Sequence, residues 1–211
     1  MNTDDFLLAL SADNAPQPSL RRRFGLALAA GAAISLVVFM TALGPRPDVL
    51  AAAHTVRFDL KFLDTLALLT PSALLCLRLS RPEVSASALL GWLLAPVALL
   101  AIAVAVELAS VPSSLWLTKV IGKNWWHCLT LVPIFSLPPL AALILALREG
   151  APRHPALTGA LAGMAAAGIS ATIYATNCTD DSPLFVATWY PLATGAVAAL
   201  GAWAGRRWLT W

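Results

Sequence analysis

Charged residues are scarce in this sequence. Only 12% of its 211 residues are Asp, Glu, Lys or Arg, whereas 59% are apolar. A soluble domain carries about 25% charged residues on average, so this composition excludes a soluble enzyme. The net charge of +3 is small and dispersed, and we expect no direct binding of nucleic acid. The composition instead predicts a protein whose solvent is the lipid bilayer.

Several patterns that indicate particular membrane proteins are also missing. The alternating pattern of a transmembrane β-barrel is absent, and no repeat of half the chain is visible, which weakens the case for a secondary transporter. The histidines His54, His127 and His154 are scattered, and neither Cys-x-x-Cys nor His-x-x-x-His spacing occurs. We therefore expect no catalytic residue and no resident cofactor.

Six apolar segments are each long enough to cross roughly 30 Å of hydrocarbon as an α-helix. Helices satisfy their backbone groups within one segment, as lipid requires. The predicted fold class is all-α, a six-helix transmembrane bundle with spans at residues 24–43, 62–79, 88–109, 128–147, 156–175 and 184–204. Residues 1–23 form an N-terminal tail, and residues 205–211 form the C-terminal segment.

The distribution of the 14 Lys and Arg residues predicts the orientation of the bundle. One set of connections and termini holds Arg21, Arg22, Arg23, Arg78, Arg81, Arg148, Arg153, Arg206 and Arg207, and the other holds Arg46, Arg57, Lys61, Lys119 and Lys123. The bias toward the first set places both termini in the cytoplasm. The Arg triplet at 21–23 also resembles a twin-arginine signal, but the apolar segment after it exceeds the usual 7–15 residues or so and opens a series of six.

Two glycine pairs indicate how the spans pack. Gly159 and Gly163 in the fifth span, and Gly201 and Gly205 in the sixth, have the Gly-x-x-x-Gly spacing that lets two helix backbones approach closely in lipid. We expect these pairs to pack helices within one chain rather than to form a dimer.

Two of the three cysteines fall on the outer side. Cys76 lies near the inner end of the second span and is expected to be a small buried apolar residue. Cys128 opens the fourth span beside His127, and Cys178 lies in the outer loop between the fifth and sixth spans. In a bacterial inner membrane this side is the oxidising periplasm, where two thiols of similar depth tend to pair. A structural disulfide and a thiol switch are both compatible with this placement.

Acidic residues next to Cys178 extend this candidate site. Thiolate, imidazole and carboxylate groups from Cys128, Cys178, His127, Asp180 and Asp181 would together suit a transient soft or borderline heavy-metal ion. The alternative for the two aspartates is a solvated turn. Two other acids, Asp64 and Glu107, lie within or at the edge of spans and are either functional or paired near the outer face.

The N-terminal tail predicts a short amphipathic helix. Thr3 can cap it, Asp4 and Asp5 suit its first turn, and Phe6, Leu7 and Leu10 form one apolar face. So short a helix is marginal alone in water, and its acidic start disfavours anionic lipid. We expect it to bind a groove on a protein partner, with a disordered tail as the alternative.

These features together resemble the NrsF family of six-span bacterial anti-sigma factors. The similarity rests on Thr3-Asp4-Asp5, Arg57-Phe58-Asp59-Leu60-Lys61-Phe62, Cys128, Arg148-Glu149-Gly150-Ala151-Pro152, and Tyr174 to Pro183 followed by Trp189-Tyr190. The resemblance implies a protein of the bacterial inner membrane that holds an extracytoplasmic-function sigma factor until stress such as heavy metal releases it. It also implies that Cys128 and Cys178 are the family's paired cysteines.

Two other functions are alternatives to this one. A membrane thiol–disulfide oxidoreductase would need a close, low-pKa cysteine pair, usually in Cys-x-x-Cys form, and a redox partner. A small-solute transporter would have only Asp64 and Glu107 to support it. The sequence favours the regulatory function over both.

Overall fold

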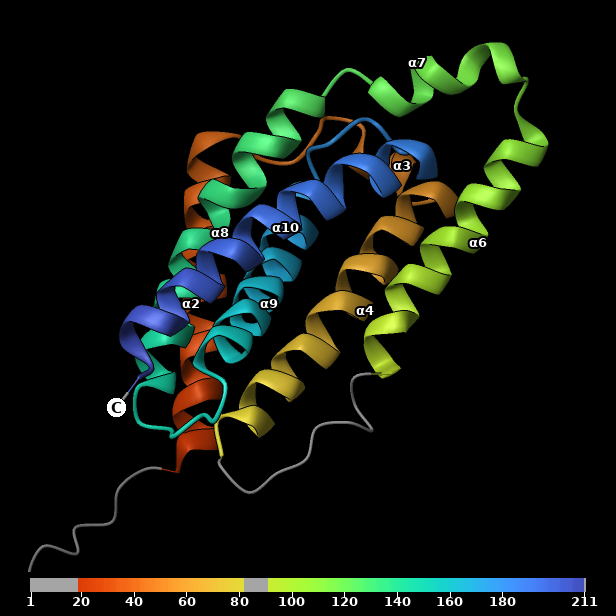
Figure 1. Ribbon diagram of the computed structural model, residues 1–211. Helices are drawn as coiled ribbons and strands as arrows, with labels where there is room; N and C mark the ends of the chain where they lie inside the picture. The colour runs from red at the N-terminus through yellow and green to blue at the C-terminus, as the bar shows by residue number, and fades with distance from the viewer. Residues whose placement is uncertain (1–18, 82–90, 211) are drawn as a thin grey trace, which may run out of the picture.

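The structure is a computed structural model that describes residues 19–81 and 91–210 (Figure 1). Within these ranges it contains helices and no strand, which confirms the predicted all-α class. In chain order the elements are α2 (Leu20–Ala42), α3 (Val49–Ala52), α4 (Val56–Leu79), η1 (Gly91–Leu93), α6 (Leu94–Ser110), η2 (Ser113–Leu115), α7 (Trp116–Ile121), α8 (Trp125–Leu147), α9 (Pro155–Ala175) and α10 (Pro183–Trp208).

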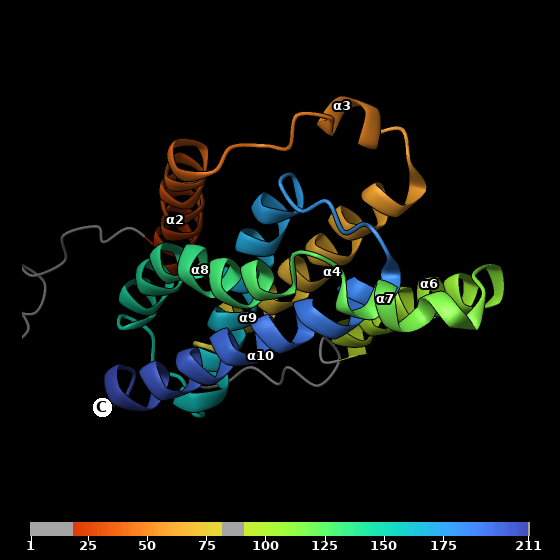
Figure 2. The same cartoon turned by 90° about the horizontal axis from the view of Figure 1, so that it is seen from above.

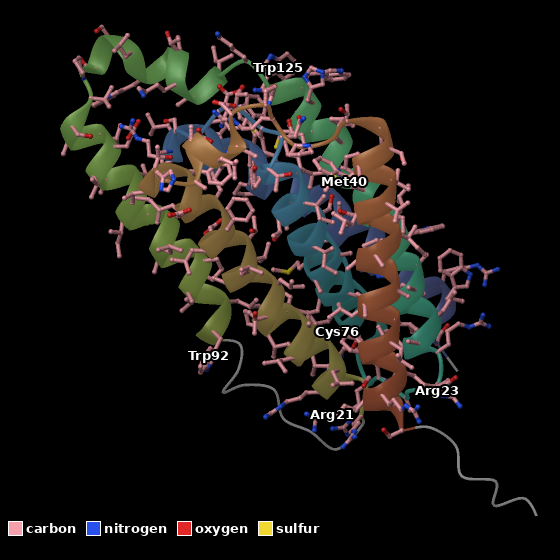
Figure 3. The ribbon with its side chains drawn as sticks, turned by 180° about the vertical axis from the view of Figure 1, so that it is seen from behind. Arg21, Arg23, Met40, Cys76, Trp92 and Trp125 are labelled. Carbon is pink, nitrogen blue, oxygen red and sulfur yellow. The ribbon has the colours of Figure 1, made fainter. Side chains whose placement is uncertain are left out.

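Six helical segments in the described ranges are long and apolar enough to cross a membrane: α2, α4, α6 together with η1, α8 together with η2 and α7, α9 and α10. Successive spans run in opposite directions, so α2 starts and α10 finishes at the same end of the bundle, termed the terminal end (Figure 1). The other end carries α3, α7 and the connection between α9 and α10, and is termed the loop end. Figure 3 shows Arg21 and Arg23 at the terminal end and Trp125 at the loop end.

The helix α4 is longer than the apolar segment that predicted it. The prediction began at residue 62, but the helix begins at Val56 and includes Arg57 and Lys61. Both cations stay helical because they form ion pairs, with Glu107 and Asp181 respectively. Charged residues ended the apolar run without ending the helix. The prediction for the third span began at 88, which lies outside the described residues.

The terminal ends of α2 and α10 also extend past the predicted boundaries. α2 begins at Leu20, directly after Ser19, whose hydroxyl accepts a hydrogen bond from the N–H of Arg22 at 3.4 Å. Residues 20–23 are therefore helical and continuous with the first long helix. α10 continues to Trp208, with Arg206 and Arg207 in its last turn. Cations are favourable at a helix C-terminus, so residues 205–208 continue the helix.

α9 is the central helix and packs against α10, α4 and α8 (Figure 2). Its close approach to α10 depends on glycine. A Cβ atom on Gly159 would lie 2.1 Å from the carbonyl oxygen of Gly201, and one on Gly201 would lie 2.2 Å from that of Gly159. Gly163 and Gly205 are similarly blocked by backbone atoms of the facing helix. The prediction that these pairs pack helices within the chain is confirmed.

α2 packs against α8 in a register that one proline helps to set. Pro139 has no N–H, so the carbonyl of Phe135 in α8 loses its partner within the helix. Ser35 of α2 donates its hydroxyl to that carbonyl at 2.6 Å. The rings of Phe39 and Phe135 meet edge to face with centroids 5.9 Å apart. A Cβ on Gly31 would lie 2.4 Å from the Cα of Pro139, so the two backbones are in close contact.

Candidate functional site

The candidate site is built around the connection at residues 176–182, termed the cysteine loop, between α9 and α10. The N–H groups of Asn177 and Cys178 both donate to the carbonyl of Tyr174, at 2.9 and 3.0 Å, and so continue the last turn of α9. Pro183 then occupies the first turn of α10, where its missing N–H has no helical partner to lose. The chain between these points is short and is held by side chains from other parts of the chain.

Cys128 and Cys178 lie in one buried cluster beneath this loop, termed the cysteine cluster. Neither residue has exposed surface, and both are free thiols in this structure. The other buried members are Val132, Ala171, Tyr174, Phe185, Val186, Tyr190 and Ala193. Cys128 comes from α8 and Cys178 from the loop that joins α9 to α10. A bond or a metal ion that bridged the two thiols would therefore link two separate parts of the bundle.

Burial keeps the thiol of Cys178 protonated. Loss of solvent raises the pKa of Cys178, while the nearby positive charge of Lys61 acts in the opposite direction and only partly offsets it. The thiolate is the form that attacks oxidants and binds metal ions. The buried, protonated thiol of Cys178 therefore differs from the exposed, low-pKa thiolates of reactive cysteines.

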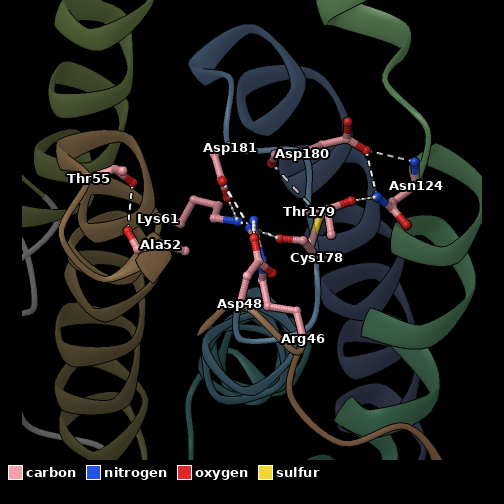
Figure 4. A network of polar contacts seen from close by, with 10 residues as sticks. All are labelled: Arg46, Asp48, Ala52, Thr55, Lys61, Asn124, Cys178, Thr179, Asp180 and Asp181. Carbon is pink, nitrogen blue, oxygen red and sulfur yellow. Dashed lines mark hydrogen bonds and ion pairs between the residues drawn. The ribbon is translucent and has the colours of Figure 1, made fainter. Parts of the chain in front are cut away.

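Two cations hold the cysteine loop closed (Figure 4). Lys61 of α4 is only 1% exposed, and its Nζ lies 2.9 Å from the carbonyl oxygen of Cys178 and 2.5 Å from Oδ1 of Asp181. Arg46 donates from Nη1 to the other oxygen of Asp181 at 2.9 Å and to the same Cys178 carbonyl at 3.4 Å. The carbonyl of Cys178 thus accepts from two cations that approach from different elements.

Arg46 is itself oriented by a second acid. Its Nε and Nη2 donate to the two carboxylate oxygens of Asp48, each at 2.7 Å. These hydrogen bonds lower the pKa of Asp48, and they raise the pKa of Arg46 further together with the contribution of Asp181. Asn177 adds a further contact to this segment through its amide, which donates to the carbonyl of Gly44 at 2.9 Å. The cysteine loop is therefore tied to the connection that directly follows α2.

Asp180 ties the loop to the start of α8. One carboxylate oxygen accepts from the backbone N–H groups of Lys123 and Asn124, at 2.9 and 2.7 Å, and from the Asn124 side chain at 2.8 Å. An anion at this position also interacts favourably with the helix dipole. Gly122 is required here because its φ is +60° and a Cβ would lie 2.8 Å from the Asp180 carboxyl carbon. The loop thus caps the helix that carries Cys128.

Glu107 closes the side of the site that faces α6. It accepts from Nε and Nη2 of Arg57 at 3.0 and 2.7 Å, lies 3.2 Å from Nζ of Lys119, and accepts from the hydroxyl of Ser182 at 3.3 Å. These partners lie on α4, α7 and the cysteine loop. Of the two alternatives for Glu107, a functional group or a paired acid, the structure supports the paired acid, because two cations compensate its charge.

Comparison with known proteins decides what kind of protein carries this arrangement. The sequence matches the model of the family NrsF, negative regulator of sigma F, over residues 8–211. The chain belongs to the NrsF family. Across the full length of both chains it is 34% identical to the anti-sigma-F factor NrsF of Caulobacter vibrioides (strain NA1000 / CB15N) and 30% identical to the probable anti-sigma-F factor NrsF of Azospira oryzae (strain ATCC BAA-33 / DSM 13638 / PS). No solved structure matches. The resemblance inferred from sequence is confirmed.

In this NrsF-family chain the structure brings together part of the predicted metal site. Cys128 and Cys178 share one cluster, but the carboxylates of Asp180 and Asp181 are engaged by protein donors. His127 lies in the first turn of α8 and is exposed. Among the residues that the structure describes, no three His, Cys, Asp or Glu side chains are grouped to hold a metal ion. Metal binding by this set would need the loop to rearrange and stays a prediction.

The predicted partner-binding residues of the tail, Asp4, Asp5, Phe6, Leu7 and Leu10, lie outside the described residues. Their role stays a prediction. Sequence reasoning also did not assign Arg46 and Lys61 to the cysteine site. The sequence feature that could have indicated Lys61 is its position one helical turn after Arg57 at the entry to an apolar span. Unpaired cations are costly there, so these two residues require anionic partners.

Proposed function

We propose that this protein is an anti-sigma factor of the bacterial inner membrane that holds an extracytoplasmic-function sigma factor at its cytoplasmic face. Release follows when a heavy-metal ion or an oxidant reacts with Cys128 and Cys178 on the periplasmic side. The observation that carries the proposal is the placement of the two thiols on separate elements of one closed, buried cluster. A reaction that involves both of them changes how α8 packs against α9 and α10.

The charge distribution supports this orientation. The terminal end carries the Arg triplet at 21–23 and the two arginines at the end of α10. An excess of Arg and Lys marks the cytoplasmic side of a membrane protein. The cysteine loop then faces the periplasm, where metal ions and oxidants arrive and where thiols are oxidised.

The contact between α8 and α2 offers a route through the bundle. Cys128 lies near the start of α8, and Ser35 and Phe39 of α2 contact Phe135 farther along the same helix. α2 begins directly after the N-terminal tail. A shift of α8 that accompanies a reaction at the cysteines would therefore move α2 and the tail attached to it. Close-packed helices of this kind change between discrete arrangements rather than deform continuously.

The sigma factor is the expected partner because the two relatives are named as anti-sigma-F factors. The apolar face of the tail, Phe6, Leu7 and Leu10, provides the main contact in this proposal, with Asp4 and Asp5 at its start. In this proposal the predicted inner connections at residues 80–87 and 148–155 and the cationic end of α10 add contacts. The lipid bilayer is the other partner, and no nucleic acid is contacted directly.

Cysteine substitutions test the sensing step. In cells with a reporter for the sigma factor, Cys128→Ser and Cys178→Ser are each expected to change the response to cadmium or chromate by at least fivefold. Cys76→Ser is the matched control, because Cys76 is equally buried but lies in the part of the core formed with Leu75 and Leu143. A normal response in both test variants would reject the sensing role.

Substitutions in the tail test the binding step. Phe6→Glu and Leu10→Glu place a charge on the expected apolar face and should free the sigma factor while the protein stays in the membrane. Asn14→Glu, beyond that face, is the control and should retain the sigma factor. Co-purification from detergent measures the outcome. Retention by both test variants would place the binding surface elsewhere.

A further inference from the structure

A groove that is separate from the cysteine site lies between α8 and α10, near the terminal end. The two helices are in contact, and both run toward that end of the bundle (Figure 1). The groove has a volume of about 420 Å³ and is termed the α8–α10 groove. Leu140, Ile144 and Ala204 are its most buried lining residues, whereas Leu145 and Trp203 are more than half exposed. The groove is therefore a hollow in the apolar outer surface of the bundle, where lipid would lie.

One end of this groove is cationic. Arg148 follows α8 directly and lines the groove. Arg207 lies in the last turn of α10, four residues after Trp203 and three after Ala204, so it shares a helix face with these two lining residues. Among the described residues, neither arginine side chain has a partner in a hydrogen bond or ion pair. α8 and α10 therefore each place an uncompensated cation beside the same apolar groove.

The length of the groove matches one acyl chain. On α8 its lining residues extend from Leu137 to Arg148, a rise of about 16 Å along the helix axis. Half of the hydrocarbon core of a bilayer is about 15 Å thick. An acyl chain whose polar end lies beside the two arginines can therefore follow the groove through one leaflet. This shape favours an amphiphile with a long apolar chain over a water-soluble anion.

The charges at the cationic end select the head group of this amphiphile. Of the described residues that line the groove, none is acidic. Glu149, the acid that follows Arg148 in the chain, is paired with Arg23. An ammonium group would therefore meet no anion here, whereas a phosphate diester can accept hydrogen bonds from both guanidinium groups. Basic pockets between transmembrane helices bind anionic lipid head groups in this way. A head group with a net negative charge is favoured over a zwitterionic one.

We propose that the α8–α10 groove binds an anionic phospholipid, with the phosphate between Arg148 and Arg207 and one acyl chain along the groove. The lipid contacts both helices, so its binding stabilises the packing of α8 against α10. Arg206 provides an internal comparison, because it lies in the same last turn but lines a different hollow, together with Arg153 and His154. Both arginines of α10 interact favourably with the helix dipole, so only lipid binding distinguishes them.

Binding is tested by native mass spectrometry of the purified full-length protein, released from detergent micelles, with palmitoyl-oleoyl phosphatidylglycerol as the probe. The fraction of protein that carries one lipid gives the Kd of the first binding event. Phosphatidylcholine with the same chains should bind at least fivefold more weakly. Arg148→Gln and Arg207→Gln should each raise the Kd for phosphatidylglycerol about fivefold, because each removes one cation from the head group. Arg206→Gln should change it less than twofold, and the double variant of Arg148 and Arg207 should bind both lipids equally.

A second pair of variants tests the apolar part of the groove. Ala141 of α8 lines the groove and is exposed, so Ala141→Phe fills the space of the acyl chain. Ala199 of α10 is also exposed but does not line the groove, so Ala199→Phe is the matched control. Ala141→Phe should abolish the first binding event, and Ala199→Phe should leave its Kd unchanged. Cooperative thermal unfolding of each variant in detergent shows that it is folded.

Three outcomes would overturn the proposal: equal Kd values of the parent for the two lipids, equal effects of Arg206→Gln and Arg207→Gln, or an unchanged Kd in folded Ala141→Phe. Dimers of the parent that disappear in Ala141→Phe would also overturn it, because they would assign the groove to a second copy of the chain. The measurement involves neither a sigma factor nor the cysteines, so its result is independent of the proposed regulatory function.

Discussion

The ion pair between Lys61 and Asp181 is expected to control whether the cysteine loop is open or closed. Asp181→Asn removes the negative charge and keeps the shape of the side chain. Lys61 is 1% exposed and would then be a buried cation that has lost the carboxylate charge paired with it. Arg46 would keep its two hydrogen bonds with Asp48. The substitution therefore acts on Lys61 and on the contact between α4 and the loop.

The size of the effect follows from the burial of the pair. Removing one partner of a buried ion pair costs about 3–5 kcal/mol, because the other charge is left without compensation. Asp181 is 21% exposed as a side chain, and Lys61 retains the Cys178 carbonyl, so we take the lower value of about 3 kcal/mol. At about 1.4 kcal/mol per factor of ten, the open population of the loop should rise about 100-fold.

The reactivity of Cys178 measures this population. In a background of Cys76→Ser and Cys128→Ser, only Cys178 reacts with N-ethylmaleimide in isolated membranes. When the loop opens and closes faster than it is labelled, the labelling rate follows the open population. Asp181→Asn should therefore be labelled about 100-fold faster than its parent.

Two controls make the result decisive. Asp48→Asn removes an acid whose side chain is 58% exposed, while Arg46 keeps Asp181, so labelling should change little. Lys61→Met with Asp181→Leu replaces the pair by apolar residues and should be labelled more slowly than Asp181→Asn. A labelling rate for Asp181→Asn within twofold of the parent, in protein that still unfolds cooperatively, would refute the role given to this pair.

Three further measurements follow from the geometry. Gly201→Ala places a Cβ 2.2 Å from a carbonyl oxygen of α9 and should lower the midpoint of thermal unfolding by several degrees. The Cβ of the control, Gly195→Ala, meets nothing within 4 Å and should leave the midpoint unchanged. Equal midpoints for the two variants would contradict the packing argument. Burial raises the pKa of Cys178, so the closed loop retains its proton while the open thiol ionises near its ordinary value of about 8.5. The closed state therefore loses stability as the pH rises above that value, and labelling should increase about tenfold per pH unit below it; a plateau at pH 7 would contradict this. Ser35→Ala leaves the Phe135 carbonyl without its donor and should cost about 1–2 kcal/mol, read as a lower thermal midpoint.

Local sequence properties predicted much of the fold. Hydropathy is summed over consecutive residues, so the six spans could be recognised one at a time. The Gly-x-x-x-Gly pairs predicted close packing because Gly159 and Gly201 lack a Cβ wherever their partner lies. Connectivity alone placed Cys128 and Cys178 near each other, since consecutive antiparallel spans are neighbours. Helix ends were predicted less well, because Arg57 and Lys61 end an apolar run but continue a helix.

The candidate site could be predicted only in part. The sequence indicated the two thiols and the two aspartates beside Cys178, but not the function of those acids. Asp181 binds Lys61 and Arg46, and Asp180 caps the start of α8, so both carboxylates are used to hold the loop. The pairing of cations with carboxylates depends on how four parts of the chain pack at the loop end: the connection after α2, helix α4, the cysteine loop and the start of α8.

The sequence by itself determined that this chain carries six segments long and apolar enough to cross a membrane and two thiols near one end of the bundle, because length, hydropathy and order along the chain are sufficient for these properties. Only the tertiary structure decided that those thiols are buried beneath a loop held by ion pairs, and that Arg148 and Arg207 lie at one end of the same groove. Partners separated by more than 100 residues, such as Lys61 and Asp181, meet because helices pack, and no local pattern encodes that contact.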